Sequence, residues 1–509
     1  MTRRLSLPPW LARGSIVAAV LLVYAVSLRA PFVAGDLPGI VHNASLRGGW
    51  REWLDGPEGF SVVLARPVLN VTFALNYAVG RLDVAGYHAV NLLIHVGNAL
   101  LLYGIIRRTR ARSEGFAWGC ALLWAIHPLQ TEAVTHLAQR AESLMTFWLF
   151  FTLYGFIRGA AGGRGWLAAS VAACLLGMGT HEDMVSAPFI VMLFDRTFLA
   201  PSWREVWRRR GGWQLAYLGT LLGAAWLGYR YHSRGHTYGF GAVPWLRYAG
   251  AAYPAFAHYL FLTVWPHPLV LGYGNHYLAS GWELLPGAMW FALFTLLAVS
   301  TFHRPTAVSF LAVAFLELLE PTSVVPHLHE TLAEHRMYPA LAPLLIGLVW
   351  AIQSAAVWLR DPRRSYLDAL RSNSPWALSG RWSYVLVIVA LGVALGAVTA
   401  ARNAVYRWQP ERLGGIPLGI CRPVPLGMAG GIREHVTARE QAERFDLLSL
   451  PVFIAAQFGG EQPGDCWSGL DGGGGVEQQG AGAAGQHIFD RPGHFHPGVP
   501  RDLALLIGQ

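Results

Sequence analysis

Long apolar stretches separated by short polar loops make up the chain as far as about residue 401. A helix that crosses a bilayer needs about 20 mostly apolar residues, because lipid offers its backbone polar groups no partner. This measure predicts an all-α polytopic membrane protein with about eleven transmembrane helices. They are expected near 15–34, 88–106, 115–128, 141–158, 165–180, 184–199, 213–229, 286–302, 305–320, 338–357 and 382–401.

One further apolar stretch, 248–271, contains Pro254, Pro266 and Pro268. Proline lacks the backbone N–H that a helix interior needs. This stretch therefore favours a broken, re-entrant or interfacial segment over a clean span.

Composition supports the membrane class and excludes others. The 509 residues are 53% hydrophobic and only 14% charged, which is too apolar for a soluble protein of this length. The chain has no lysine, and its 39 basic residues are all arginine. Because these arginines gather in a few loops, the net charge of +9 reflects membrane topology and does not indicate nucleic-acid binding.

The arginine-rich loops lie before the first predicted span and after the second, sixth and tenth. Cationic loops stay on the cytoplasmic side, so the N-terminus is expected inside and the C-terminus outside. The acidic residues and histidines then collect on the external face. A large first external loop, residues 35–87, lies on this face.

The stretch "HPLQTEAVTHLAQRAE" at 127–142 interrupts two apolar runs on that external face. Glu132, His136 and Arg140 fall four residues apart, so an unbroken helix starting at Pro128 would carry them as one stripe. The stripe fits either the charged wall of an external cavity or a solvated helix that connects two spans.

Three further polar positions lie outside. Asp36 follows the first span, where a carboxylate can act as a general base on a hydroxyl, hold a cation, or simply be solvated. The run "HLHETLAEHRMYP" at 327–339 combines glutamate and histidine, which can bind a divalent metal, with Arg336, which can grip a phosphate. The run "GMGTHEDM" at 177–184 fits a polar hairpin.

The character of the chain changes after about residue 413, where it becomes rich in glycine and loses its apolar period. Two parts are therefore expected: a transmembrane domain over 1–410 and a mostly disordered tail over 411–509.

Four motifs carry a specific resemblance: "RPVLNVTFALNYAVGRLDVAGYHAVNLLIHVGNALLLY", "LLWAIHPLQTEAVTHLAQRAESL", "GTHEDMVSAPFIVMLFD" and "LAEHRMYPALAP". In this order they resemble the transmembrane and tetratricopeptide-repeat-containing family, including its bacterial members, over about residues 15 to 410. That family belongs to the glycosyltransferase C superfamily, and its eukaryotic members are protein O-mannosyltransferases.

The resemblance implies a membrane glycosyltransferase that moves a sugar, with mannose as one candidate, from a polyprenyl-phosphate donor to a hydroxyl of a protein or glycan. It implies an integral protein of a bacterial inner membrane, with its active site on the periplasmic or external face. Its partners are the lipid-linked donor, the acceptor and the bilayer. No cofactor is assigned, and a divalent cation remains an open alternative.

The resemblance also implies roles for residues. The catalytic position falls on Asp36, an acid of the first external loop. Binding of the donor phosphate falls on Arg336, His335 and His181. The expected cavity wall or substrate-binding residues are Arg66, His88, Glu132, His136, Arg140, Glu182, Glu334 and Tyr338; none is expected to bind a metal.

The chain departs from the family in three places. Gly35 stands where the family commonly has a second acid, and His181 stands where it commonly has lysine. No tetratricopeptide repeats follow Arg402 and Asn403, which suggests a truncation or a frameshift in the reading frame. A transporter of lipid-linked glycans, a non-catalytic membrane scaffold and a decayed enzyme are the competing interpretations.

Overall fold

The computed structural model describes residues 8–33, 35–57, 63–109, 114–231, 245–273, 281–303, 305–324, 331–360 and 382–408. The chain divides into two units, Met1–Gly430 and Gly431–Gln509, and every described residue lies in the first. The tail expected over 411–509 lies outside the described residues.

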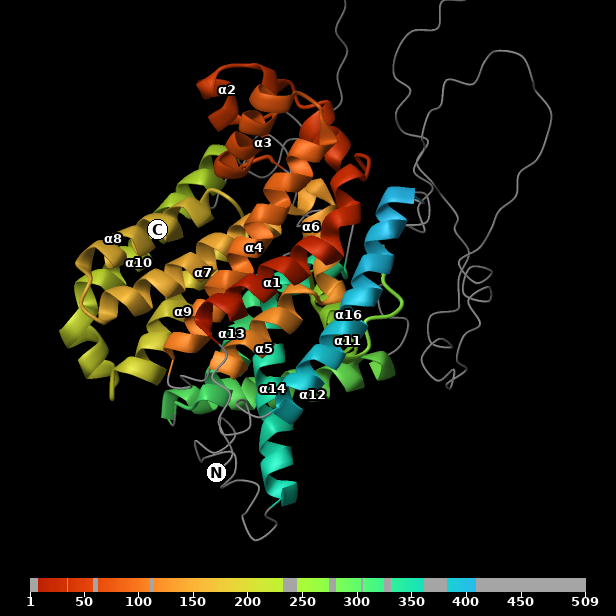
Figure 1. Cartoon of the computed structure of the whole chain (residues 1–509). Helices are drawn as coiled ribbons and strands as arrows, with labels where there is room; N and C mark the ends of the chain where they lie inside the picture. The colour runs from red at the N-terminus through yellow and green to blue at the C-terminus, as the bar shows by residue number, and fades with distance from the viewer. Residues whose placement is uncertain are drawn as a thin grey trace, which may run out of the picture. The chain divides into compact units, whose positions relative to one another are not determined.

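All regular elements of the described residues are helices, which confirms the all-α prediction (Figure 1). The longer helices are α1 (Pro9–Tyr24), α3 (Pro67–Gly80), α4 (Val84–Arg108), α5 (Glu114–Ala125), α7 (Arg140–Ala160), α8 (Arg164–Met178), α10 (Trp203–Tyr231), α11 (Trp245–Val264), α12 (Leu284–His303), α13 (Ala307–Val324), α14 (Met337–Arg360) and α16 (Trp382–Trp408). The short helices include α2 (Trp50–Asp55), α6 (Thr131–Thr135), α9 (Ala187–Phe194) and the 3-10 helices η3 (Ala44–Arg47), η4 (Pro128–Gln130), η5 (Leu137–Gln139), η6 (Glu182–Ser186) and η9 (Glu334–Arg336).

Five helical segments of the described chain are long and apolar enough to cross a membrane, as expected for an integral membrane protein. Each of the eleven predicted spans overlaps helical residues, yet the number of eleven crossings is not confirmed. The qualifying segments are Pro9–Arg29, Val84–Arg108, Gly281–His303, Glu334–Ser354 and Tyr384–Trp408.

The proline-containing stretch at 248–271 differs in part from its prediction. Helix α11 runs through Pro254 without a break and ends at Val264. The chain leaves helical geometry immediately before Pro266, so the prolines that end this helix are those after it.

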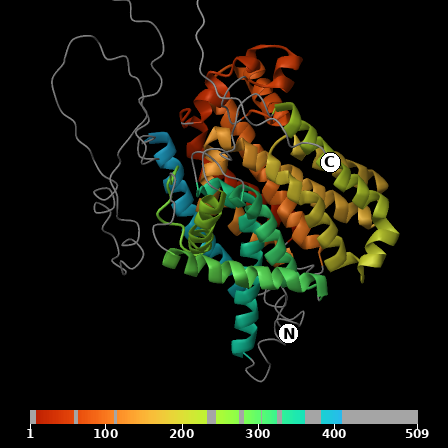
Figure 2. The same ribbon diagram turned by 180° about the vertical axis from the view of Figure 1, so that it is seen from behind.

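The helices pack mainly on their sequence neighbours (Figures 1 and 2). Helix α4 contacts α5 and α7, α7 contacts α8, and α11 to α14 pack one after another. Helix α16 returns to α1 and α5, so that the last described helix lies beside the first. The buried centre includes the rings of Tyr24, Trp124 and Tyr338 around His95.

The described part of the expected first external loop is folded into helices. Helices α2 and α3 pack together with η3 at one end of the bundle, the top of Figure 1. Two buried amides hold this cap: the Asn43 side chain donates to Asn70 Oδ1 at 3.0 Å, and the Asn70 amide donates to the Trp53 carbonyl at 2.8 Å. The cap brings Arg66, at the start of α3, to the loop that precedes α9.

Candidate functional site

Asp36 lies completely buried just after the first helical segment. Its Oδ2 accepts the Val33 N–H at 2.9 Å, and its Oδ1 accepts the Ala138 N–H at 2.5 Å. The His136 ring lies 3.5 Å from Oδ1 through Nε2. Burial raises the pKa of the Asp36 carboxyl, while His136 and the backbone donors act to lower it.

The single helix expected from Pro128 to Arg140 is wrong. Helix α6 ends at Thr135, and His136 has extended backbone angles, φ −76° and ψ 111°. The chain then makes the turn η5 before α7 begins at Arg140. An i, i+4 stripe needs continuous helical geometry, so Glu132, His136 and Arg140 face three different partners.

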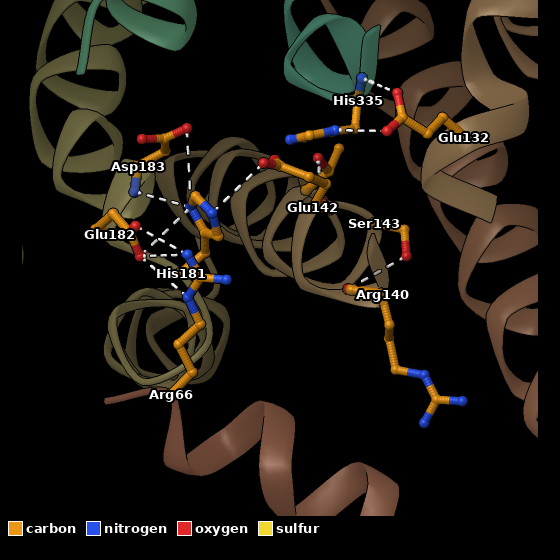
Figure 3. A network of polar contacts seen from close by, with 10 residues as sticks. Arg66, Glu132, Arg140, Glu142, Ser143, His181, Glu182, Asp183 and His335 are labelled. Atoms are coloured by element: carbon orange, nitrogen blue, oxygen red, sulfur yellow. Dashed lines mark hydrogen bonds and ion pairs between the residues drawn. The ribbon is translucent and has the colours of Figure 1, made fainter. Parts of the chain in front are cut away.

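Arg140 points into the protein, away from the other charged residues of Figure 3. It is fully buried, and its guanidinium donates to Asn91 Oδ1 at 2.6 Å, to Asn76 Oδ1 at 2.7 Å and to the Tyr87 carbonyl at 3.0 Å. Its central carbon also lies 4.4 Å from the centre of the Phe73 ring. These contacts join α7 to α3 and α4.

Glu132 and His335 form a direct pair between α6 and η9 (Figure 3). The His335 backbone N–H donates to Glu132 Oε2 at 2.9 Å, and His335 Nδ1 lies 2.8 Å from Glu132 Oε1. Burial raises the pKa of the Glu132 carboxyl, against the lowering effect of nearby cationic groups that include His136 and Arg402. This pair joins the second and fourth sequence motifs in space.

Glu334, next to His335, is also buried. Its Oε1 accepts the Val270 N–H at 2.5 Å and the Tyr273 hydroxyl at 2.9 Å, so the segment after α11 closes over it. Tyr273 is a contact that the sequence did not single out.

Arg66 and Glu182 form a bidentate ion pair between α3 and η6. Arg66 Nη2 lies 2.8 Å from Glu182 Oε1, and Nε lies 3.1 Å from Oε2. Burial alone would raise the pKa of Glu182, but the Arg66 guanidinium holds it well below its usual range. The pair fixes the loop before α9 against the first external cap.

His181 lies between two more carboxylates (Figure 3). Its Nε2 is 3.4 Å from Glu142 Oε1, and its Nδ1 is 3.8 Å from Asp183 Oδ2. All three side chains are buried. Burial and the neighbouring charge of Glu182 raise the pKa of the Asp183 carboxyl.

Two arginines lie near these acids. Arg336 is buried and donates to the Thr331 carbonyl at 3.4 Å. Arg402, on α16, has a buried Nε and Nη2 that no hydrogen bond satisfies within the described chain. A guanidinium with two buried, unused donors suits an anionic ligand such as a phosphate.

The remaining expected residues, His88 and Tyr338, are packed inside the helices. His88 Nε2 lies 3.0 Å from the Ala30 carbonyl. The Tyr338 hydroxyl lies 2.7 Å from His95 Nδ1 and accepts the Asn98 amide at 3.0 Å. Tyr338 therefore joins α14 to α4, and His88 joins α4 to the segment after the first helical segment.

Sequence reasoning missed Glu142 and Arg402, and it gave Asp183 no role. Glu142 stands in the interrupted run itself, but an i, i+4 stripe from Glu132 passes over it. Of the possible metal ligands near residue 330, His327, His329 and Glu330 lie outside the described residues.

Comparison with known proteins adds an independent line of evidence. Human protein O-mannosyl-transferase TMTC1 is 34% identical over 164 residues, which cover 30% of this chain and 19% of that protein. Human protein O-mannosyl-transferase TMTC4 is 26% identical over 219 residues, covering 37% of this chain and 30% of that protein. The chain is similar to the protein O-mannosyl-transferases. The resemblance predicted from the four motifs is thereby confirmed.

The match spans less than a third of the length of these protein O-mannosyl-transferases. No protein-family model matches the chain. The crystal structure of ArnT from Cupriavidus metallidurans bound to undecaprenyl phosphate aligns with 77% of this chain and 78% of its own, at 16% identity and a TM-score of 0.41. That likeness is too low to carry an argument.

Proposed function

We propose that this protein is a membrane glycosyltransferase. It moves a sugar from a polyprenyl-phosphate donor to a hydroxyl of a protein or glycan on the external face of the membrane. The similarity to protein O-mannosyl-transferases supports this class and makes mannose the first sugar to test. One structural observation carries the proposal: the buried Asp36 carboxylate is oriented by two backbone N–H groups beside the His136 ring.

Asp36 is the proposed general base. A carboxylate has about four lone-pair sites. Two backbone donors therefore orient Asp36 and still leave sites that can take the acceptor's proton. As that O–H bond breaks, the acceptor oxygen forms a bond to the anomeric carbon of the sugar. The bond from that carbon to the donor phosphate breaks, and the polyprenyl phosphate leaves with the electron pair, which inverts the sugar.

Phosphate is a good leaving group, so the protein mainly has to position it and neutralise its negative charge. Arg336, His335 and His181 are the proposed phosphate-binding residues, and Arg402 joins them because its buried Nε and Nη2 are unused. Glu132 orients His335 through its backbone N–H and its Nδ1.

The test uses the full chain reconstituted in liposomes with radiolabelled polyprenyl-phosphate mannose and peptides that offer serine and threonine hydroxyls. Asp36→Asn removes the base, and a general base contributes about 10²–10⁴-fold to a rate. Transfer by this variant should fall by that factor. Asp83→Asn is the matched control, because Asp83 caps α4 and asparagine caps a helix equally well.

Equal transfer rates for wild type and a folded Asp36→Asn protein would remove Asp36 from the mechanism. A donor that crosses the vesicle wall with its sugar still attached, and no transfer, would support the transporter instead. These two readouts come from one preparation.

A further inference from the structure

Three buried side chains from two elements meet beside the proposed site. Glu142 comes from the first turn of α7, and His181 and Asp183 come from the start of η6 (Figure 3). Each can offer one ligand atom, and these atoms all lie within 4.8 Å of one another. The side chains of Glu142 and Asp183 are each 2% exposed and that of His181 5%, so water does not solvate the group freely.

The two carboxylates are not fully satisfied. Glu142 Oε2 and Asp183 Oδ1 are buried and have no hydrogen-bond partner in the described structure. Leaving a buried charged oxygen without a partner is costly, and such atoms are rare in native proteins. Figure 3 shows the Glu142 carboxylate directed at the His181 ring.

Charge gives the same indication. Glu182, the third acid of this region, is neutralised by its bidentate pair with Arg66. Glu142 and Asp183 share one histidine between them. The guanidiniums of Arg66 and Arg336 also act on both carboxylates, and a divalent cation bound between the carboxylates would neutralise them directly.

We propose that Glu142, His181 and Asp183 bind one divalent transition-metal ion, of the Mn²⁺ or Zn²⁺ class. One nitrogen and two carboxylates form a donor set that suits these ions better than Mg²⁺, which prefers oxygen alone. Ligands about 2.1 Å from an ion lie about 3.4 Å apart in a tetrahedron and at most about 4.2 Å apart. The ligand atoms of the three side chains lie within 4.8 Å of one another, so a movement of less than about 1 Å would bring them into that range.

The histidine supplies one ring nitrogen. Its two nitrogens lie beside different acids, Nε2 beside Glu142 and Nδ1 beside Asp183, so the ring contacts both carboxylates. The ion binds one ring nitrogen and one oxygen of each carboxylate, and it offers a partner to the unpartnered Glu142 Oε2 and Asp183 Oδ1.

The test measures metal binding, so its outcome does not depend on the proposed transferase activity. With the ion bound, His181 would act on the donor phosphate through the ion. The full chain in detergent micelles is stripped with a chelator and titrated with MnCl₂, and free Mn²⁺ is followed by electron paramagnetic resonance. Wild type should bind one equivalent, with nitrogen coupling from His181 in the pulsed spectrum. Asp183→Asn and Glu142→Gln should each weaken binding about tenfold or more.

Two further proteins keep the result clear. Glu205→Gln is the control. Glu205 pairs with Arg208 and Arg209 in the first turn of α10, so this change should leave the Mn²⁺ affinity unchanged. His181→Lys places an ammonium between the two carboxylates, so it should fold without metal and bind no Mn²⁺. Absence of a one-equivalent site in wild type, absence of nitrogen coupling, or wild-type affinity in a folded His181→Lys protein would each overturn the proposal.

Discussion

A substitution of Arg140 tests whether this residue stabilises the fold or binds the donor. The sequence predicts Arg140 in the wall of the donor cavity, but its guanidinium lies among Asn91, Asn76 and Tyr87. We therefore expect Arg140→Met to lower the stability of the protein. The affinity of any surviving folded protein for the donor should not change.

The expected loss of stability can be worked out from the hydrogen-bond partners that Arg140→Met would leave unsatisfied. Asn91 Oδ1 and Asn76 Oδ1 would lose their guanidinium donors. Each buried acceptor left without a partner costs about 1–3 kcal/mol. Loss of the contact with the Phe73 ring adds about 1 kcal/mol. Because these losses share neighbours and are not additive, the expected decrease in unfolding free energy is about 3–5 kcal/mol.

The assay is denaturant unfolding in detergent micelles, followed by tryptophan fluorescence. Arg140→Lys should lose less stability. An ammonium can keep one of the two asparagine partners, but it lacks the planar set of donors with which the guanidinium reaches both. The control is Arg164→Met, because Arg164 is exposed at the start of α8 and should change stability by less than about 0.5 kcal/mol. A loss below about 1 kcal/mol in Arg140→Met, together with lost donor binding, would refute the structural role.

Three shorter predictions follow. Burial raises the pKa of Asp36, and only the ionised carboxylate can act as a base. The value of kcat/KM should therefore fall as the pH drops through a value above the usual aspartate pKa of about 3.9. A kcat/KM that does not change down to pH 4 would contradict this. Gly287→Ala would drive its Cβ into the Tyr253 carbonyl where α12 meets α11, so thermal unfolding should show a loss of about 1–3 kcal/mol. A double-mutant cycle of Arg66→Ala and Glu182→Ala should give a coupling of about 1–2 kcal/mol in unfolding free energy, and a coupling near zero would argue against the bidentate pair.

Hydropathy located the helices because each apolar segment in a membrane must pair its backbone N–H and C=O groups within itself. Every predicted span overlaps helical residues for this reason. The path through Pro254 was harder to predict, since neighbouring helices can support a proline that an isolated helix would not tolerate. Helix α11 packs along α12 and α13, which supplies that support.

The site was less predictable because its pairs are distant in sequence. Glu132 meets a residue 203 positions later, and Arg66 meets one 116 positions later. The spacing of residues in one sequence predicts which side chains are neighbours on the same helix. It does not predict contacts between residues that are far apart in the sequence. The motifs placed Glu132, Glu182 and His335 among the candidates, but only the fold assigned their partners.

The break in the helix at His136 allows residues 127–142 to contribute to the candidate site. In a continuous helix the Ala138 N–H would bond to the carbonyl of Val134, and Asp36 would be buried with one donor fewer. The extended backbone at His136 releases that N–H to Asp36 and turns the ring toward the same carboxylate. It also starts α7 afresh, so that Glu142 falls in its first turn and faces His181. One local departure from helical geometry thus positions both the proposed base and one proposed metal ligand, which is why an unbroken stripe found neither arrangement.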